Sequence, residues 1–209
     1  IGIQDGLADH FLDGSDVECR ITGAIGSTST TGALPVGNAT AGTLFSNVTI
    51  TATRNISLPA HTAGDLLLLV VLLRNTNHDQ NFNSINTAGW TQAGGVGNEY
   101  GILGTSDSII GFGWAIGNGS DTLVNITTTG GTGTSRLIAR VYRFTAAIGF
   151  ASPPVQNIGT PTTGTGTSLG MPTATRVTTN DLAVTVYASS TAGTVAAATG
   201  ETGGNWTEA

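Results

Sequence analysis

Residues 66–73 read Leu-Leu-Leu-Leu-Val-Val-Leu-Leu, and this apolar stretch decides the fold class of the chain. It is eight residues long, whereas an apolar helix needs roughly 20 residues to cross a bilayer. Turn-forming residues bound the stretch, with Gly64 and Asp65 in front of it and Asn75 behind it. A short apolar run between turn signals is typical of a buried central strand. We therefore expect a β-sheet core and no membrane insertion.

Further strand-like segments, separated by turn clusters, lie on both sides of this run. They are found at 48–53, 109–116, 122–128, 136–144, 182–188 and 193–198. The first of them alternates in side-chain character as a half-buried strand does, whereas the polar stretch 75–86 is predicted to be a loop. No segment shows sustained apolar helical periodicity, which disfavours an α/β architecture. The pattern predicts an all-β fold, an antiparallel β-sandwich or jelly roll.

The strand expected at 136–144 contains three arginines, Arg136, Arg140 and Arg143. Residues an even number of positions apart share one face of a strand. Arg136 and Arg140 therefore share a face, and Arg143 lies on the other. Because both faces receive a charged side chain, we expect these arginines at an edge of the sheet or near the ends of the strand.

Composition and charge exclude several classes of function. The chain has 209 residues, of which 31 are glycine and only 10% are charged. All seven basic residues are arginines, and 13 acidic residues give a net charge of -6. Such a chain offers no basic surface for a phosphate backbone, so nucleic-acid binding is not expected. Cys19 is the only cysteine, which excludes an intrachain disulfide.

The first 32 residues differ in composition from the rest. Acidic residues are followed by a Gly/Ser/Thr stretch at 23–32. The acidic positions are Asp5, Asp9, Asp13, Asp16 and Glu18. Their spacing does not match an EF-hand loop, which favours a solvated arm over a site for an ion or an inter-subunit ion pair. We therefore divide the chain into an irregular N-terminal arm and linker at 1–32, with a short helix around 4–12, and a β-sandwich domain at 33–209.

A long-range feature indicates an internal duplication. Asp65 opens an apolar segment and Trp90 follows 25 residues later, while Asp181 opens a second apolar segment and Trp206 again follows 25 residues later. The two signatures are 116 residues apart, which favours a repeated half-motif over coincidence. The first copy continues through further strands but the second does not, so we expect the domain to be truncated at its C-terminal end.

The residues of these signatures, with their neighbours, resemble a known module. The matching segments are Leu58-Pro59-Ala60, Gly64-Asp65-Leu66-Leu67-Leu68, Gly89-Trp90-Thr91, Arg140-Val141-Tyr142-Arg143-Phe144, Asp181-Leu182-Ala183-Val184 and Trp206-Thr207-Glu208-Ala209. They are similar to a β-sandwich module that recurs in bacteriophage virion proteins of the tail-fibre, appendage and head-decoration types, and the resemblance covers 56–209. It implies a structural role in the virion, with other virion proteins and copies of the same chain as partners. It supplies no catalytic residues.

The residues themselves offer little for catalysis or metal binding. His10, His61 and His78 form no metal-ligand pair, and the chain has no Gly-x-Ser-x-Gly motif. The four glutamates lie in the arm or in Gly-rich turns; they are Glu18, Glu99, Glu201 and Glu208. We therefore predict a protein that is not an enzyme and has no catalytic residue, no metal site and no cofactor.

The three tryptophans are the remaining candidate site residues. Trp90, Trp114 and Trp206 could stack on a sugar or pack inside the sandwich. Since Trp90 and Trp206 occupy equivalent positions of the repeat, packing is favoured. The leading expectation is a structural component of a phage virion that assembles as a symmetric oligomer, a trimer being the natural form. The alternative is a carbohydrate-binding or adhesion module that recognises a host-surface glycan.

Overall fold

The computed structural model describes residues 19–24, 40–47, 52–75, 81–93, 100–101, 107–129, 135–145, 150, 152–155 and 183–188. These ranges contain β-strands and no helix, and all strand pairs are antiparallel. The strands are β1 (Cys19–Ala24), β2 (Thr40–Ala41), β3 (Phe45–Asn47), β4 (Ala52–Ser57), β5 (Leu66–Asn75), β6 (Asn81–Ile85), β7 (Thr91–Ala93), β8 (Tyr100–Gly101), β9 (Asp107–Ile116), β10 (Leu123–Thr129), β11 (Ser135–Phe144) and β12 (Ala183–Ala188). The described part of the chain is therefore all-β, as the sequence predicts.

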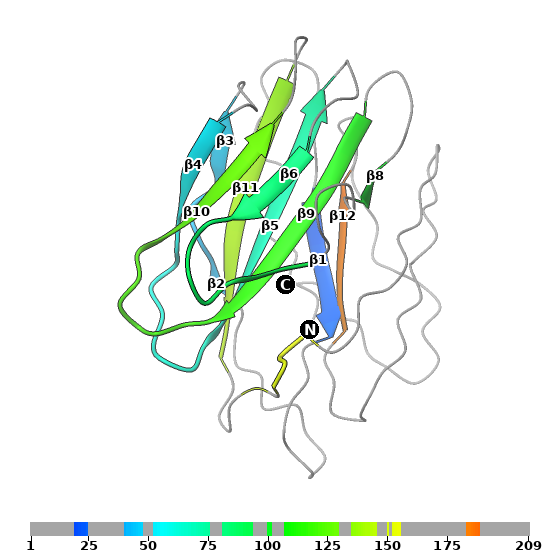
Figure 1. The fold of residues 1–209 in the computed structure, drawn as a ribbon. Coiled ribbons are helices and arrows are strands. Elements are labelled where there is room, and N and C mark those ends of the chain that lie inside the picture. Colours follow the sequence, from blue (N-terminus) through cyan, green and yellow to red (C-terminus); the bar gives the residue numbers. More distant parts are fainter. Residues whose placement is uncertain are drawn as a thin grey trace, which may run out of the picture.

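Two packed sheets form a β-sandwich. The large sheet has the order β2-β11-β5-β9-β7, with β3 also paired to β11 and β8 also paired to β9. The small sheet has the order β4-β10-β6 and lies in front of the large sheet in Figure 1. The antiparallel sandwich is confirmed, whereas the finer jelly-roll topology stays a prediction.

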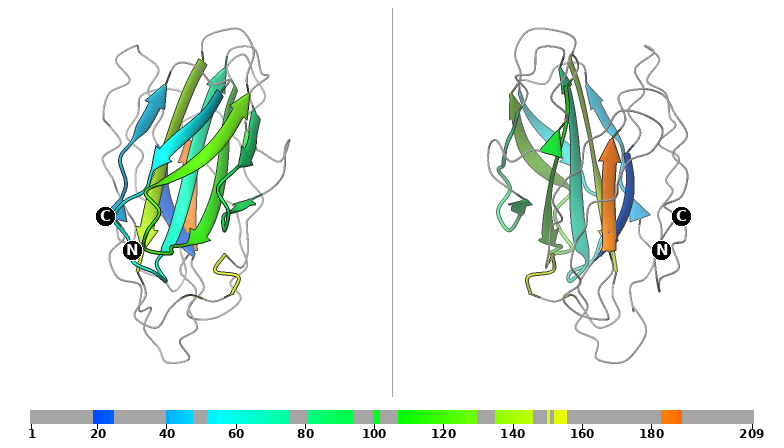
Figure 2. Two further views of the ribbon diagram at one scale, coloured as in Figure 1. Left: turned by 60° about the vertical axis from the view of Figure 1, so that its left-hand side comes forward. Right: turned by 90° about the vertical axis from the view of Figure 1, so that its right-hand side faces the viewer.

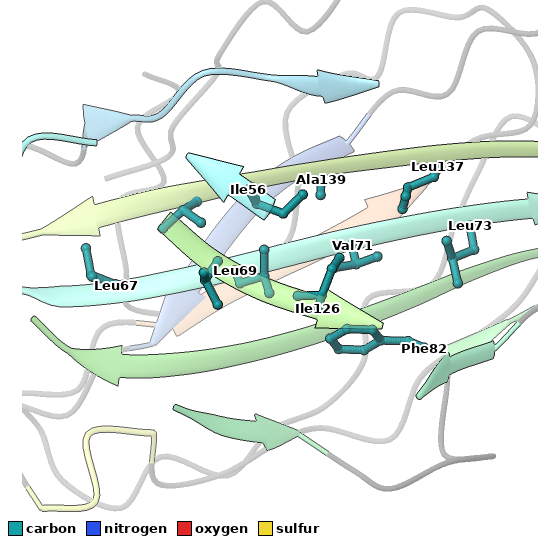
Figure 3. Packing of buried hydrophobic residues seen from close by; sticks show 11 residues of the cluster. Ile56, Leu67, Leu69, Val71, Leu73, Phe82, Ile126, Leu137 and Ala139 are labelled. Carbon is teal, nitrogen blue, oxygen red and sulfur yellow. The ribbon is translucent and has the colours of Figure 1, made fainter. Parts of the chain in front are cut away.

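Strand β5 is the central strand of the large sheet. It pairs with β11 on one side and β9 on the other over its whole length. The residues at 66–73 are all buried, so both faces of the strand are covered. Leu67, Leu69, Val71 and Leu73 point into the space between the sheets, where they join the core cluster (Figure 3). Each fully buried leucine contributes about 1.5–3 kcal/mol to stability, which makes the run at 66–73 the main source of the core.

The small sheet provides the opposite wall of that core. Ile56 from β4, Val124 and Ile126 from β10, and Phe82 from β6 are buried and contact the large sheet's cluster. Strand β10 shows the alternation that this packing requires, because every second residue from Val124 onward is buried. Its odd-numbered residues therefore face away from the core.

Two glycines of β9 let the sheets approach closely. A Cβ atom added to Gly111 would overlap the ring of Phe82, and one added to Gly113 would overlap the Cδ1 atom of Ile85 and lie 2.7 Å from the carbonyl oxygen of Thr91. Glycine within a strand often marks such a close approach. The alternating Gly-x-Gly of β9 thus provides the space that the large β6 side chains fill.

Gln92 of β7 connects the two sheets through its side chain. Its Nε2 donates to the carbonyl oxygen of Phe82 at 3.1 Å, and its Oε1 accepts from the backbone N–H of Ile85 at 3.2 Å. Both backbone groups belong to β6, which pairs with β10 through its other edge. The amide of Gln92 therefore bonds the edge of β6 in the way that a further strand would.

The pair β1–β12 lies behind the large sheet, on the face opposite the small sheet, and β12 contacts β9 (Figures 1–3). It also adds a regular strand within 1–32, where the sequence analysis expects an irregular arm. The helix expected around 4–12 lies outside the described residues.

The strands expected at 109–116, 122–128, 136–144 and 182–188 correspond to β9, β10, β11 and β12. The prediction of a loop over 75–86 is wrong, because β6 occupies Asn81–Ile85. Its high asparagine and serine content disfavours a strand, and the burial of Phe82 outweighs that local preference. The segment 193–198 lies outside the described residues, and for the segment 48–53 the structure shows only its last two residues, which begin β4.

The arginines of β11 occupy three different environments. Arg136 lies near the start of the strand and Arg143 near its end, as expected. The alternative position at a sheet edge is wrong for β11, since it is paired on both sides. Arg140 lies within the strand, where its Nε donates to the carbonyl oxygen of Gly42 at 2.8 Å.

The proposed duplication is not reproduced by the strand pairing in the described residues. Asp65 precedes β5, which pairs with two strands of the large sheet, whereas the segment after Asp181 forms β12, which pairs with β1. The two aspartates thus precede strands in different sheets. Trp206 lies outside the described residues, so the duplication and the truncation stay predictions.

Candidate functional site

The outward surface of the small sheet is the most distinctive polar surface in the described part of the chain. We call it the amide–hydroxyl face, and it consists of Thr53, Asn55 and Ser57 on β4, Leu123, Asn125, Thr127 and Thr129 on β10, and Asn83, Ser84 and Asn86 on or just after β6. Nine of these ten side chains are amides or hydroxyls, and none is charged. Strand alternation places the β4 and β10 residues on this face, and a register irregularity in β6 between Phe82 and Ser84 lets the consecutive residues Asn83 and Ser84 both contribute to it.

A chain of side-chain hydrogen bonds crosses the three strands of this face. Ser84 Oγ donates to Asn86 Oδ1 at 2.7 Å, and Asn86 Nδ2 donates to Asn125 Oδ1 at 2.7 Å. Asn125 Nδ2 in turn donates to Asn55 Oδ1 at 2.7 Å. All donors point the same way, from β6 toward β4. Aligned hydrogen bonds of this kind polarise one another and strengthen the chain.

Hydroxyl groups fix the same face at further points. Thr53 and Thr127 share a hydroxyl–hydroxyl bond at 3.2 Å, and Asn86 Nδ2 also donates to Thr127 Oγ1 at 2.8 Å. Thr129 Oγ1 donates to Asn83 Oδ1 at 3.0 Å. Eight of the ten side chains are therefore held by hydrogen bonds within the face, although all ten are at least partly solvent-exposed.

A second polar cluster lies where β5 begins. Asp65 closes a turn with Thr62, and Gly64 adopts a φ of 94°, which glycine tolerates at the third position of a type II turn. Asp65 Oδ2 accepts from the Thr62 N–H at 2.7 Å, from Thr62 Oγ1 at 3.0 Å and from Arg143 Nε at 2.8 Å. Arg143 Nη1 also donates to the carbonyl oxygen of Ala60 at 3.0 Å. The cluster ties the turn before β5 to the end of β11.

The carboxylate of Asp65 is only 8% exposed, and the Arg143 side chain is 24% exposed. Burial by itself opposes ionisation of Asp65, but the hydrogen bonds from Thr62 and the positive charge of Arg143 outweigh it and lower the pKa of Asp65 below its usual 3.8. Asp65 is therefore an ionised residue whose Oδ2 accepts three hydrogen bonds, which suits a structural anchor. A general acid would need a raised pKa.

The two tryptophans in the described ranges have different environments. Trp90 is half-buried and packs against the core cluster between the sheets. Trp114 is also half-buried, but it alternates with Gly113 and Ala115 and so points away from that core. They thus lie on opposite faces of the large sheet. Trp206 lies outside the described residues, and the choice between a ligand-binding and a packing role stays a prediction.

Of the three histidines, only His61 falls in the described ranges. Its Nδ1 lies 3.0 Å from the carbonyl oxygen of Pro59 and donates to it, while Nε2 is buried against Gly117 without a hydrogen-bond partner. No group of three or more His, Cys, Asp or Glu residues suited to a metal ion occurs among the residues that the structure describes. The acidic positions 5–18 and all four glutamates lie outside them.

The amide–hydroxyl face is a feature that sequence reasoning missed. Part of the signal is present in the sequence: Asn125 and Thr127 alternate with Val124 and Ile126, and Thr53, Asn55 and Ser57 occupy every second position of 52–57. What the sequence could not show is that β4 and β10 are neighbours in register, with Asn55 opposite Asn125. That register turns two separate polar rows into one surface.

A scan against protein-family models finds no match to this chain, and searches of curated proteins and of solved structures find none either. Across the described ranges, no helix is long and apolar enough to cross a membrane. The fold class and the geometry above are thus what the structure contributes to a functional assignment.

Proposed function

We propose that this chain is a non-enzymatic structural component of a bacteriophage virion: a decoration, head-fibre or tail-fibre protein that assembles through subunit contacts. The observation that carries the proposal is the placement of the residues that resemble the virion module. Leu58 packs against the core cluster, Gly64 supplies the positive φ of the turn, and Asp65 bonds Arg143. Their packing, turn geometry and ion pair support a structural role for this segment of the chain.

The sandwich itself also supports a structural role. Its core joins two sheets through side chains from β4, β5, β6, β10 and β11. The turn before β5 is held within itself and to the end of β11 by an ion pair and four further hydrogen bonds. A domain stabilised both in its core and at the turn before β5 suits a protein that must keep its shape within a particle. We propose a symmetric homo-oligomer, with a trimer as the specific form.

Mass spectrometry of gradient-purified virions tests the location, with immunogold electron microscopy to show where on the particle the chain lies. The expected result is co-purification at a fixed copy number in intact particles. Recovery only from the particle-free fraction of the lysate would overturn the proposal. Light scattering on the purified chain tests the trimer, which requires three times the 21.0 kDa mass of one chain.

A further inference from the structure

The amide–hydroxyl face has a composition that sheet stability does not favour. Asn55 and Asn125 lie directly opposite each other within β4 and β10. Asparagine is depleted in strands, while threonine is favoured there and would keep the face equally soluble. Residues that contradict local preference are often found at functional sites. The position of these amides, on the exposed side of the sheet, is therefore informative.

The hydrogen-bond chain prepares this face for a ligand. Each amide that takes part is fixed by its neighbours, so little side-chain freedom remains to be lost on binding. The chain ends at Asn55, whose Nδ2 has no hydrogen-bond partner among the described residues. It begins at Ser84, whose hydroxyl oxygen retains lone pairs for accepting. Donors and acceptors are thus presented side by side at fixed positions.

The chemistry of the face selects the class of ligand. A ligand with charged groups would find no counter-charge among the ten side chains, and the net charge of -6 of the chain opposes an acidic ligand further. An apolar partner would bury amides and hydroxyls without new hydrogen bonds, which is costly. A ligand rich in hydroxyl groups can both donate to and accept from such a surface. We propose that the amide–hydroxyl face binds a neutral glycan.

This inference does not rest on the proposed virion location, and the two fail separately. A chain absent from virions could still bind a neutral glycan through this face, and a virion protein could lack the site. The face also differs from a tryptophan platform, because it contains no aromatic side chain.

Affinity electrophoresis in native gels containing dextran, mannan or galactomannan tests the proposal, with dextran sulfate as the charged counterpart. The decisive variant is the pair Asn55→Thr and Asn125→Thr, which removes two amides and keeps strand-favouring side chains. We expect a neutral polysaccharide to retard the unsubstituted chain. The variant should bind at least about tenfold more weakly, because each lost hydrogen bond contributes modestly but several are lost together. The melting temperature should shift by no more than about 4 °C.

Ser46→Ala provides the matched control, because Ser46 is an exposed residue of β3 in the large sheet. It should bind as the unsubstituted chain does. Three results would overturn the proposal: no retardation by any neutral polysaccharide, retardation by dextran sulfate only, or equal retardation of the threonine variant. Loss of binding together with a large drop in melting temperature would show that the amides serve the fold instead.

Discussion

Replacing Gly111 by alanine is expected to destabilise the sandwich because of a single contact. The added Cβ would overlap the ring of Phe82, and it would lie 2.9 Å from the ring carbon Cγ and 3.1 Å from Cβ of the same residue. Phe82 is 1% exposed and belongs to the core cluster, so the ring has little room to move. Overpacking of this kind costs about 1–3 kcal/mol, and an alanine in a strand recovers about 0.5–1 kcal/mol of backbone entropy relative to glycine.

The net effect is a loss of up to about 2.5 kcal/mol, which urea denaturation can measure. The stronger test is a double-mutant cycle with Phe82→Leu. That change alone should cost about 1–2 kcal/mol through lost apolar contact. In the double variant the alanine fills part of the space that the smaller leucine leaves, so the combined loss should fall short of the sum by about 1 kcal/mol.

Gly89→Ala is the matched control for this cycle. A Cβ at Gly89 would meet no atom within 4 Å, but its φ of +83° strains any other residue. Its loss of stability, about 1 kcal/mol, should therefore not be relieved by Phe82→Leu. If the losses from Gly111→Ala and Phe82→Leu were simply additive, the role assigned to the β9 glycines would be refuted.

Two further variants test the polar contacts. Asp65→Asn should lower the free energy of unfolding by about 1–3 kcal/mol near pH 7. The pKa of Asp65 is lowered from 3.8 in the folded state. The stability that the ionised carboxylate contributes is therefore present above pH 3.8 and is lost as pH falls through the folded pKa. Urea unfolding near pH 7 and near pH 3 measures this, and an equal cost at both would contradict it. Gln92→Ala should cost about 1–2 kcal/mol and speed amide exchange at Ile85, whereas Gln92→Glu keeps that acceptor and should protect Ile85; equal exchange in both variants would argue against the bond.

The fold class follows from local patterns in the sequence. The run at 66–73 is apolar at every position, and only a strand covered on both faces or a buried helix can satisfy that pattern. The short length of the run and the turn residues at its ends favour the strand over the helix. The structure confirms this prediction, because the run forms β5 and is buried throughout. Strands β9, β10 and β11 follow from alternation and turn signals in the same way.

The missed elements depend on contacts between distant residues. β6 resembles a polar loop in sequence, since Phe82 and Ile85 are its only apolar residues, yet both insert opposite the glycines of β9. Likewise β1 gains its strand structure by pairing with β12, more than 150 positions further along the chain. No local pattern encodes such partners, and the amide–hydroxyl face could not be assembled without the register of β4 on β10.

The two hydrogen bonds between Gln92 and β6 affect how copies of this domain can associate through their sheet edges. Open-ended polymerisation by strand addition requires two complementary free edges, one at each side of a sheet. In the small sheet the edge of β6 is already occupied, because the amide of Gln92 takes the donor of Ile85 and the acceptor of Phe82. Strand addition to this edge of the small sheet would have to displace both hydrogen bonds of Gln92.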